Sequence, residues 1–323
     1  MVSSVGLSRC LYAFLSFLIS VALSGFAPDD GKCTIFTYGR MEVLNSVGSP
    51  IVRAAVNGHP VAFEVDSGAQ FTMVDPQYSE LLELGPRVGS SMGTGVGGST
   101  LVSVSSIDKL DLGTSQAHNI AVIEGGHFNH KIGALPIVGL FGADFLANYE
   151  MMVDMPDHEV RLAKVRGCAD PTPVWKGRST KINIDREGSS SNMIGLSVKV
   201  NGHPVDAILD TGAQITLLSL SEAHHVGVTD AMLALDRVGT IRGVANNPRK
   251  SFIHRFDTLQ VGDIVLHNVV FAVSDALSEQ DMLLGADFLQ HHRVWIKLWD
   301  DTGYIQHDKD IPADDPIRRR ELD

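Results

Sequence analysis

The sequence has few cysteines, few basic residues and only one long apolar segment, and each shortage narrows what the protein can be. It contains 3 cysteines and no Cys-x-x-Cys pair, which excludes the common zinc-finger and dithiol redox motifs. Its 26 Lys and Arg are outnumbered by 38 Asp and Glu, which gives a formal net charge of −12. Because the phosphate backbone repels an acidic surface, we expect no nucleic-acid partner.

The one long apolar segment lies at the N-terminus. After Arg9, residues 10–27 carry no charge and end in small residues, a pattern typical of a secretory signal peptide cut near Ser24 or Ala27. An uncleaved anchor is the alternative, because the segment is at the lower length limit for spanning a bilayer. In both cases we expect residues 1–27 to direct export, to the periplasm or out of the cell, with membrane contact only if the segment stays attached.

Cys10 lies inside that segment, which leaves Cys33 and Cys168 in the mature chain. These two residues bracket the first half of the chain, and in an oxidising compartment a disulfide would tie its ends together. Two separate buried thiols are the other possibility, and the sequence does not decide between them.

What the sequence does have is an ordinary globular composition. Hydrophobic residues make up 44% and charged residues 20%, which argues against disorder, collagen and a membrane protein with several spans. At about 100 to 200 residues per domain, the 323 residues predict two domains or one large one.

The chain repeats itself. Asn-Gly-His-Pro-Val occurs at residues 57–61 and 201–205, and Asp-Ser/Thr-Gly-Ala-Gln at 66–70 and 210–214, both 144 residues apart. Three matches in the same order, with Gly-Ala-Asp-Phe-Leu at 142–146 and 285–289 as the third, indicate a duplicated module. We expect a first lobe at 34–168, a linker at 169–177, a second lobe at 178–300 and a polar tail at 301–323.

Each copy is expected to consist mainly of strands. Asn-Gly pairs at 57–58 and 201–202 separate extended segments, which is the strongest short signal for a tight hairpin. Alternation within residues 61–65 directs their apolar side chains to one face, so Asp66 points the other way. Helices are predicted only as short segments at 77–84 and 220–225 and after Gly142 and Gly285.

Two equivalent loops carry the chemistry. Asp66-Ser67-Gly68 and Asp210-Thr211-Gly212 each follow an apolar strand, and each is matched later by two apolar residues and a glycine ahead of a short helix. In these features the sequence resembles the aspartic proteases, most closely the retropepsin-like branch, in a tandem single-chain form. The resemblance covers most of both copies. It implies an all-β acid-protease fold of two retropepsin-like β-barrel lobes related by pseudo-twofold symmetry.

The residue types suit peptide hydrolysis without a metal or a nucleophilic side chain. Two carboxyl groups about 3 Å apart cannot both ionise, so they share one proton and supply both a base and an acid. The resemblance makes Asp66 and Asp210 the dyad that activates a water, and it has the hydroxyls of Ser67 and Thr211 brace the two loops. Gly68 and Gly212 permit a tight turn and offer N–H groups to the carboxylates. No cofactor is expected.

Both halves lie in one chain, so we expect an intramolecular pseudo-dimer that is active as a monomer on a polypeptide in extended conformation. Pairing between chains is the competing arrangement. A non-catalytic peptide-binding or assembly module on the same scaffold is the rival function, because a fold does not fix an activity. A metal-dependent hydrolase is a third hypothesis, which predicts inhibition by chelators.

A glycine-rich segment follows each aspartate, with Gly95 and Gly239 both 29 residues after the aspartate of their copy. The first, at residues 93–98, matches Gly-x-Gly-x-x-Gly, but strand-like alternation follows where a nucleotide-binding fold requires a helix. In the resembled family a hairpin at this place closes over the substrate, and the absence of the Tyr typical of pepsins favours the retropepsin-like branch. The flap residues implied are Gly95, Val96 and Gly97 in the first copy and Gly239, Arg242 and Gly243 in the second.

The remaining candidates are weaker. His127 and His130, the pair at 224–225 and the pair at 291–292 lack a Cys or carboxylate at a recognised ligand spacing, so we expect surface or turn residues and no metal site. Asp144 and Asp287 recur in the repeat, and we interpret them as helix caps.

Overall fold

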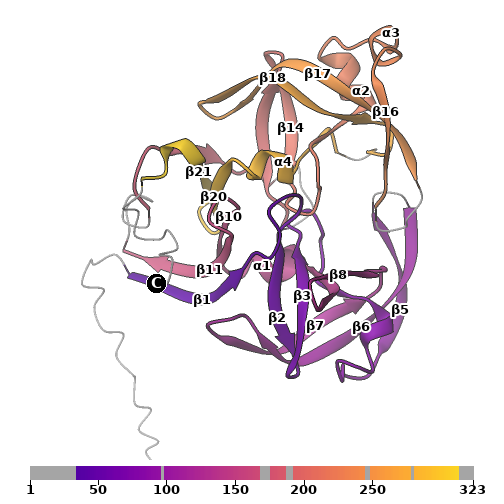
Figure 1. The fold of residues 1–323 in the computed structure, drawn as a ribbon, viewed down its shortest axis with the longest axis vertical. Coiled ribbons are helices and arrows are strands. Elements are labelled where there is room, and N and C mark those ends of the chain that lie inside the picture. Colours follow the sequence, from indigo (N-terminus) through magenta and orange to yellow (C-terminus); the bar gives the residue numbers. More distant parts are fainter. Residues whose placement is uncertain are drawn as a thin grey trace, which may run out of the picture.

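The structure is a computed structural model of the 323-residue chain, and it describes residues 34–95, 98–167, 175–186, 192–243, 248–277 and 280–312. Two β-lobes flank a smaller sheet, and helices are few and short (Figure 1). The predicted leader, Cys33 and Cys168 lie outside the described residues. Within the described ranges, every helix is too short or too polar to cross a bilayer.

The first lobe is a closed barrel of six strands. They follow the order β2-β3-β9-β4-β7-β6, and β6 pairs back onto β2, which closes the ring. Closure removes the free edges that would otherwise invite pairing with other chains. Outside the ring, β5 pairs with β6 and β8 with β9. The strands are β2 (Ile51–Val56), β3 (His59–Val65), β4 (Met73–Val74), β5 (Val88–Gly95), β6 (Gly98–Asp111), β7 (Gln116–Glu124), β8 (His130–Ile132) and β9 (Leu135–Phe141).

The second lobe repeats this ring strand for strand. Its order is β13-β14-β19-β15-β18-β17, and β17 pairs with β13 to close it, while β16 extends β17 as β5 extends β6. The prediction of an all-β fold with two related barrels is therefore confirmed. The strands are β13 (Gly195–Val200), β14 (His203–Leu209), β15 (Leu217–Ser219), β16 (Arg237–Ile241), β17 (Arg249–Val261), β18 (Ile264–Ser274) and β19 (Met282–Leu284).

A third sheet takes strands from both copies. Its order is β1-β11-β10-β20-β21-β12, and the pairing of β10 with β20 joins the two halves at its centre. The buried guanidinium of Arg293 on β20 lies 3.5 Å from Asp154 on β10 and 4.5 Å from the ring centre of Trp175. One continuous apolar core includes residues of both lobes and of this sheet. The strands are β1 (Thr34–Glu42), β10 (Glu150–Asp154), β11 (Glu159–Arg166), β12 (Thr180–Asn183), β20 (His292–Lys297) and β21 (Thr302–His307).

The predicted hairpins form at both Asn-Gly pairs. Asn57 and Gly58 have φ angles of 49° and 91°, and Asn201 and Gly202 have 49° and 83°. Two successive residues in the left-handed region define the tight turn that matches the twist of the flanking strands. The prediction from these dipeptides is confirmed in both lobes.

The helices agree with the prediction except at two places. The segments α1 (Ala143–Leu146), α2 (Leu220–His225) and α4 (Ala286–Leu289) lie where expected, and α3 (Asp230–Leu233) is additional. The helix predicted at 77–84 is wrong, because only the 3₁₀ turn η1 (Pro76–Tyr78) forms there. Glu83 then takes a φ of 51°, which no helix can accommodate.

The predicted polar tail begins too early. Strand β21 occupies residues 302–307, and its Ile305 is fully buried between Val294 of β20 and Thr180 of β12. The strand was not predicted because it contains polar residues, which the sequence alone suggests are exposed. In the structure these residues have buried partners: Gln306 accepts a hydrogen bond from Arg293 Nε at 2.7 Å. The short turn η2 (Asp308–Asp310) follows.

Candidate active site

The two aspartates lie at the ends of equivalent strands where the lobes meet. Asp66 follows β3, and its N–H donates to the carbonyl of Phe141 at the end of β9, 3.0 Å away. Asp210 follows β14, and its N–H donates to Leu284 of β19, also at 3.0 Å. Each of these strand pairs is parallel, so each loop leaves the sheet beside the end of its neighbour. The sequence repeat thus becomes a pair of facing loops.

The side chains of Asp66 and Asp210 are hydrogen-bonded to each other. One oxygen of each carboxyl also accepts two backbone N–H groups, so neither side chain is free to rotate away. Asp66 Oδ1 accepts from Gly68 at 3.0 Å and Ala69 at 2.9 Å, and Asp210 Oδ1 accepts from Gly212 at 2.9 Å and Ala213 at 3.0 Å.

Burial raises the pKa of both carboxyls. For Asp66 the pKa lies well above its usual value, because the negative charges of Asp210 and Glu64 add to the effect of burial. For Asp210 the backbone N–H donors oppose the effect of burial on the pKa but do not cancel it. Because the two groups are in contact, their protons titrate as those of a pair. Such a pair retains one proton where an isolated aspartate has lost its own, which provides an acid and a base together.

The loop glycines are required by proximity. A Cβ atom on Gly68 would overlap the Asp210 carboxyl, and one on Gly212 would overlap the Asp66 carboxyl. Neither glycine has a positive φ. The tight turn predicted as the reason for these glycines is therefore not the cause, and the close approach of the opposite carboxyl is.

Ser67 and Thr211 brace the loops across the interface between the lobes. Ser67 Oγ donates to Leu209 O at 2.6 Å, and Thr211 Oγ1 donates to Val65 O at 2.5 Å. Each hydroxyl also accepts the other residue's N–H, at 3.1 Å on Ser67 Oγ and 2.9 Å on Thr211 Oγ1. Both side chains are buried, so water cannot replace these bonds. The four bonds fix the distance between the loops.

Asp144 and Asp287 are not at the N-cap positions, contrary to the prediction, although each accepts the N–H of the next residue in its own helix, at 2.7 and 2.9 Å. The N-cap positions are Gly142 and Gly285, without a side-chain cap. Asp144 Oδ1 also accepts both the N–H and the hydroxyl of Thr72, each at 2.8 Å. Asp287 binds Thr216 in the same way, at 2.9 and 2.7 Å. These contacts tie each short helix to the chain just after its aspartate loop.

Thr72 and Thr216 are site residues that the sequence reasoning missed. Both are buried, and their hydroxyls accept the N–H groups of Gly142 and Gly285 at 3.1 Å. The signal was present, because the threonines are also 144 residues apart.

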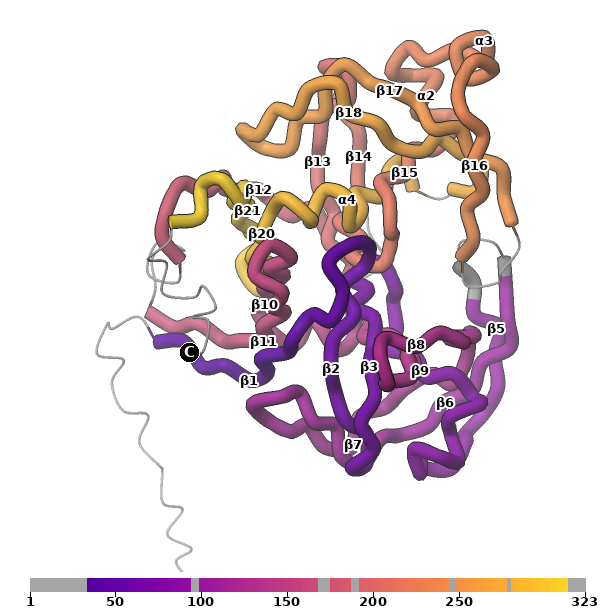
Figure 2. The backbone as a smooth tube through the Cα atoms, in the orientation of Figure 1, coloured from indigo at the N-terminus to yellow at the C-terminus, as the bar shows by residue number. Residues whose placement is uncertain are grey.

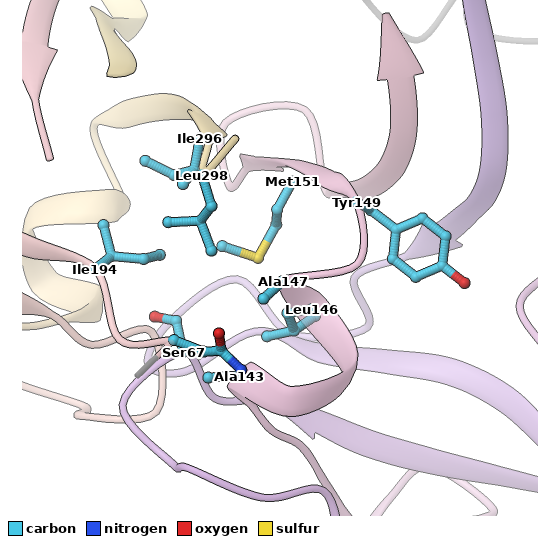
Figure 3. A pocket seen from close by; sticks show the side chains of 10 residues that line it. Ser67, Ala143, Leu146, Ala147, Tyr149, Met151, Ile194, Ile296 and Leu298 are labelled. Atoms are coloured by element: carbon cyan, nitrogen blue, oxygen red, sulfur yellow. The ribbon is translucent and has the colours of Figure 1, made fainter. Parts of the chain in front are cut away.

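A small apolar pocket lies between the Ser67 loop, α1 and the shared sheet (Figure 3). Its walls include Leu146, Met151, Ile194 and Leu298, while the ring of Tyr149 points away from it. The lining offers no titratable group directed inward, so we assign the pocket a packing role behind the active loop.

The predicted flaps are hairpins in both lobes. Strands β5 and β6 pair up to Gly95 and Gly98, and β16 and β17 pair up to Ile241 and Arg249. Figure 2 shows the ends of the two hairpins at which these pairings stop turned toward each other on one side of the molecule. Gly95 ends β5, Gly239 lies inside β16, and Arg242 and Gly243 follow it, whereas Val96 and Gly97 lie outside the described residues.

The histidine pairs have local partners. His224 contacts Asp230 at 3.1 Å, His225 contacts Glu222 at 3.0 Å and His291 contacts Asp308 at 3.2 Å. Among the described residues, no three His, Cys, Asp or Glu side chains gather as metal ligands. The surface prediction is wrong for His292, which is buried and stacks on Phe288 with ring centres 4.1 Å apart.

A family model described as aspartyl protease matches both copies, at residues 52–145 and 196–288. The chain belongs to the aspartyl protease family. The two matches together cover more than half of the chain, and each includes one Asp-Ser/Thr-Gly loop and most of one barrel. The family resemblance read from the repeated motifs is confirmed.

Relatives within the family share only part of their length with this chain. DNA damage-inducible protein 1 of Kluyveromyces lactis is 26% identical over 155 residues, which are 47% of this chain and 36% of that protein. Protein DDI1 homolog 2 of Homo sapiens is 36% identical over 110 residues, 33% of this chain and 26% of that protein. The chain thus matches about a third of these relatives' length.

The fold is also that of a solved aspartic proteinase, from Irpex lacteus. The two structures align with a TM-score of 0.53 over 87% of this chain and 99% of that one, at 14% sequence identity. At this identity the similarity shows a shared fold only. The activity has to be inferred from the chemistry of the site.

Proposed function

We propose that the protein is an exported aspartic endopeptidase that hydrolyses extended peptides with Asp66 and Asp210. The observation that supports this most strongly is the dyad itself: two carboxyls in contact, one half-buried and one buried, with raised pKa values and held by equivalent loops. A decayed site would not need both aspartates, both glycines and both bracing hydroxyls.

The chemistry needs only the dyad and a water. The ionised carboxyl takes a proton from the water, and the water oxygen attacks the peptide carbonyl carbon. At the same time the protonated carboxyl gives its proton to the carbonyl oxygen. The tetrahedral product then collapses: the dyad gives its proton to the amide nitrogen, the C–N bond breaks, and a hydroxyl proton of the product returns to the dyad. The pair ends as it began, with one shared proton.

The two lobes supply one complete site within a single chain. Strand pairing between β10 and β20, the shared core and the cross-lobe bonds of Ser67 and Thr211 hold the halves together. We therefore expect the monomer to be active. Gel filtration with activity only in a dimeric peak would contradict this.

The hairpins β5–β6 and β16–β17 fit a role as flaps over the substrate. Backbone groups of an extended peptide pair readily with strand edges, and closure excludes water from the dyad. Export is part of the proposal because residues 1–27 have the pattern of a signal peptide. N-terminal sequencing of the protein recovered outside the cytoplasm checks it, and a protein found only in the cytoplasm with residue 1 retained would contradict it.

Loss of either aspartate tests the activity. Wild type, Asp66→Asn and Asp210→Asn are incubated with a denatured protein at mildly acid pH, with Asp206→Asn as a control that alters an exposed aspartate of β14, the strand that precedes Asp210. We expect cleavage by wild type and the control and a loss of at least about 10³-fold in both dyad variants. If all four are inert while peptides still bind, the non-catalytic peptide-binding alternative replaces this proposal.

A further inference from the structure

The two lobes differ at the residue that lies two positions before each aspartate. The first lobe has Glu64 there, and the second has Ile208, 144 residues later. Side chains two apart on a strand share a face, so Glu64 is on the side of Asp66 and Ile208 on the side of Asp210. The two copies are closely similar in sequence around the aspartates, but beside them the first copy has a carboxyl where the second has an aliphatic side chain.

Glu64 has an unusual environment for an acid. It is half-buried in the central strand β3, between β2 and β9, where its register partners are Ile51 and Leu140. Its carboxyl contacts the Ser49 side chain and is repelled by the negative charges of the dyad. Among the described residues, no Lys, Arg or His forms an ion pair with it. An acid in this position is costly unless a cation joins it.

The corresponding face of the second lobe is apolar. Ile208 packs in a separate buried cluster with Leu217 and Leu283, and Ile241 and Ile253 of the hairpin β16–β17 pack against that cluster. The same cluster includes Ala272 and Leu277. The dyad therefore lies between one face that carries a carboxyl and one on which the described cluster around Ile208 is apolar.

An extended peptide would meet these two faces with different residues. Its successive side chains point to opposite sides, so the two residues that flank the scissile bond face different lobes. A cationic side chain beside Glu64 would form a charge-assisted hydrogen bond and offset repulsion from the dyad. An apolar side chain would suit the face around Ile208.

We infer that Glu64 selects Lys or Arg at one of the two positions flanking the scissile bond, with an aliphatic or aromatic residue preferred at the other. The inference rests on the proposed peptidase function and adds its substrate class. Burial, which raises the pKa of Glu64 to about 7, agrees with a carboxyl that lacks its cation. A bound ammonium or guanidinium group favours the ionised form, so the basic preference should strengthen as pH rises toward and through 7. The charged groups that act on Glu64 in this range are Asp66 and Asp210.

Cleavage of a mixed peptide library by wild type, Glu64→Gln and Glu64→Ile tests the inference. Glu64→Gln keeps the shape and removes the charge, and Glu64→Ile makes the position like Ile208. Glu80→Gln is the matched control, since it neutralises an exposed carboxyl of the same lobe. We expect wild type and control to favour Lys or Arg over norleucine at one flanking position by about tenfold or more, and both Glu64 variants to lose this preference while still cleaving norleucine peptides.

A binding measurement separates this inference from the proposed activity. Two probe peptides carry a hydroxyethylene group in place of the scissile amide and either Lys or norleucine beside it, and their Kd values are measured for all four proteins by calorimetry. Cleavage without a basic preference, or a preference unchanged by Glu64→Gln, overturns the inference and leaves the peptidase proposal standing. Tighter binding of the Lys probe that depends on Glu64, without any cleavage, supports the inference and overturns the peptidase proposal. Neither cleavage nor a Glu64-dependent difference in binding overturns both.

Discussion

Asp66 and Asp210 titrate as a pair at the centre of this molecule, and a third carboxyl, that of Glu64, acts on the pair through its charge. Burial and the charge of Asp210 raise the pKa of Asp66, and Glu64 raises it further as a third negative charge. Proton loss from the dyad, which would end the proposed catalysis at high pH, therefore depends on a residue outside the dyad.

Glu64→Gln should shift the alkaline limb of the pH profile of kcat/KM toward lower pH. A negative neighbour raises the pKa of Asp66, so removing it lets the shared proton leave at a lower pH. The measurement is kcat/KM for a norleucine peptide from pH 3 to 9, which avoids any effect of basic side chains. A limb that stays in place, or moves to higher pH, would show that Glu64 is not coupled to the dyad.

Thr211→Ala should cost about 2 kcal/mol of unfolding free energy and most of the activity. The substitution leaves Val65 O and Ser67 N–H buried without their partner and loosens the spacing of the loops. Thr211→Ser, which keeps the hydroxyl, is the control and should lose much less of both. Urea unfolding and peptide cleavage measure the two effects. If Thr211→Ala and Thr211→Ser lose equal amounts of stability and activity, the effect comes from the lost methyl group and not from the hydroxyl.

At the scale of elements, the same turns and the same helix contacts occur in both lobes. Asn-Gly turns join the first strands of each barrel, and a threonine and an aspartate tie each short helix to its active loop. The turns depend on backbone conformation more than on side-chain contacts. Gly202, for example, has a φ of 83° and open space around the position that a Cβ would take.

Gly202→Ala should destabilise the protein by about 1 to 2 kcal/mol through its backbone conformation alone. Gly202→Asn is the control, because asparagine tolerates the left-handed region better than alanine. We expect the asparagine variant to lie between wild type and alanine in urea unfolding midpoint, with cleavage unchanged in all three. An alanine variant as stable as wild type would mean that the turn relaxes to another type.

At the scale of the whole molecule, the shared sheet makes the lobes interdependent. β21 pairs with β20 and β12, and β20 pairs with β10 of the first copy. Heat should therefore unfold both barrels in one transition rather than lobe by lobe.

Ile305→Asn should lower the stability of the whole protein by about 3 kcal/mol or more, because it places an amide at a fully buried position. Ile305→Val is the control and should cost about 1 kcal/mol. Calorimetry is the measurement, and we expect a single peak at a lower temperature in Ile305→Asn. Two separate peaks would show that the sheet does not couple the lobes, and an unchanged peak would agree with the solvated tail predicted for residues 301–323.

The sequence by itself determined the local and repeated features. Asn57-Gly58 specifies a turn because few residues tolerate a positive φ, and the strands before Asp66 and Asp210 follow from alternation within a few neighbours. The internal repeat then predicts that two like loops face each other, which is why the family and both aspartates could be found without coordinates.

Only the tertiary structure decided the features that depend on partners far away in the chain. Gln306 and Arg293 look like surface residues until they are found buried against each other, and the contact of Asp144 with Thr72 appears only in the folded chain. Glu64 looks like one polar residue in an apolar strand until the second lobe brings Asp210 to it. Burial and charge act through space, and the distances that set their strength are fixed only when both lobes and the shared sheet assemble.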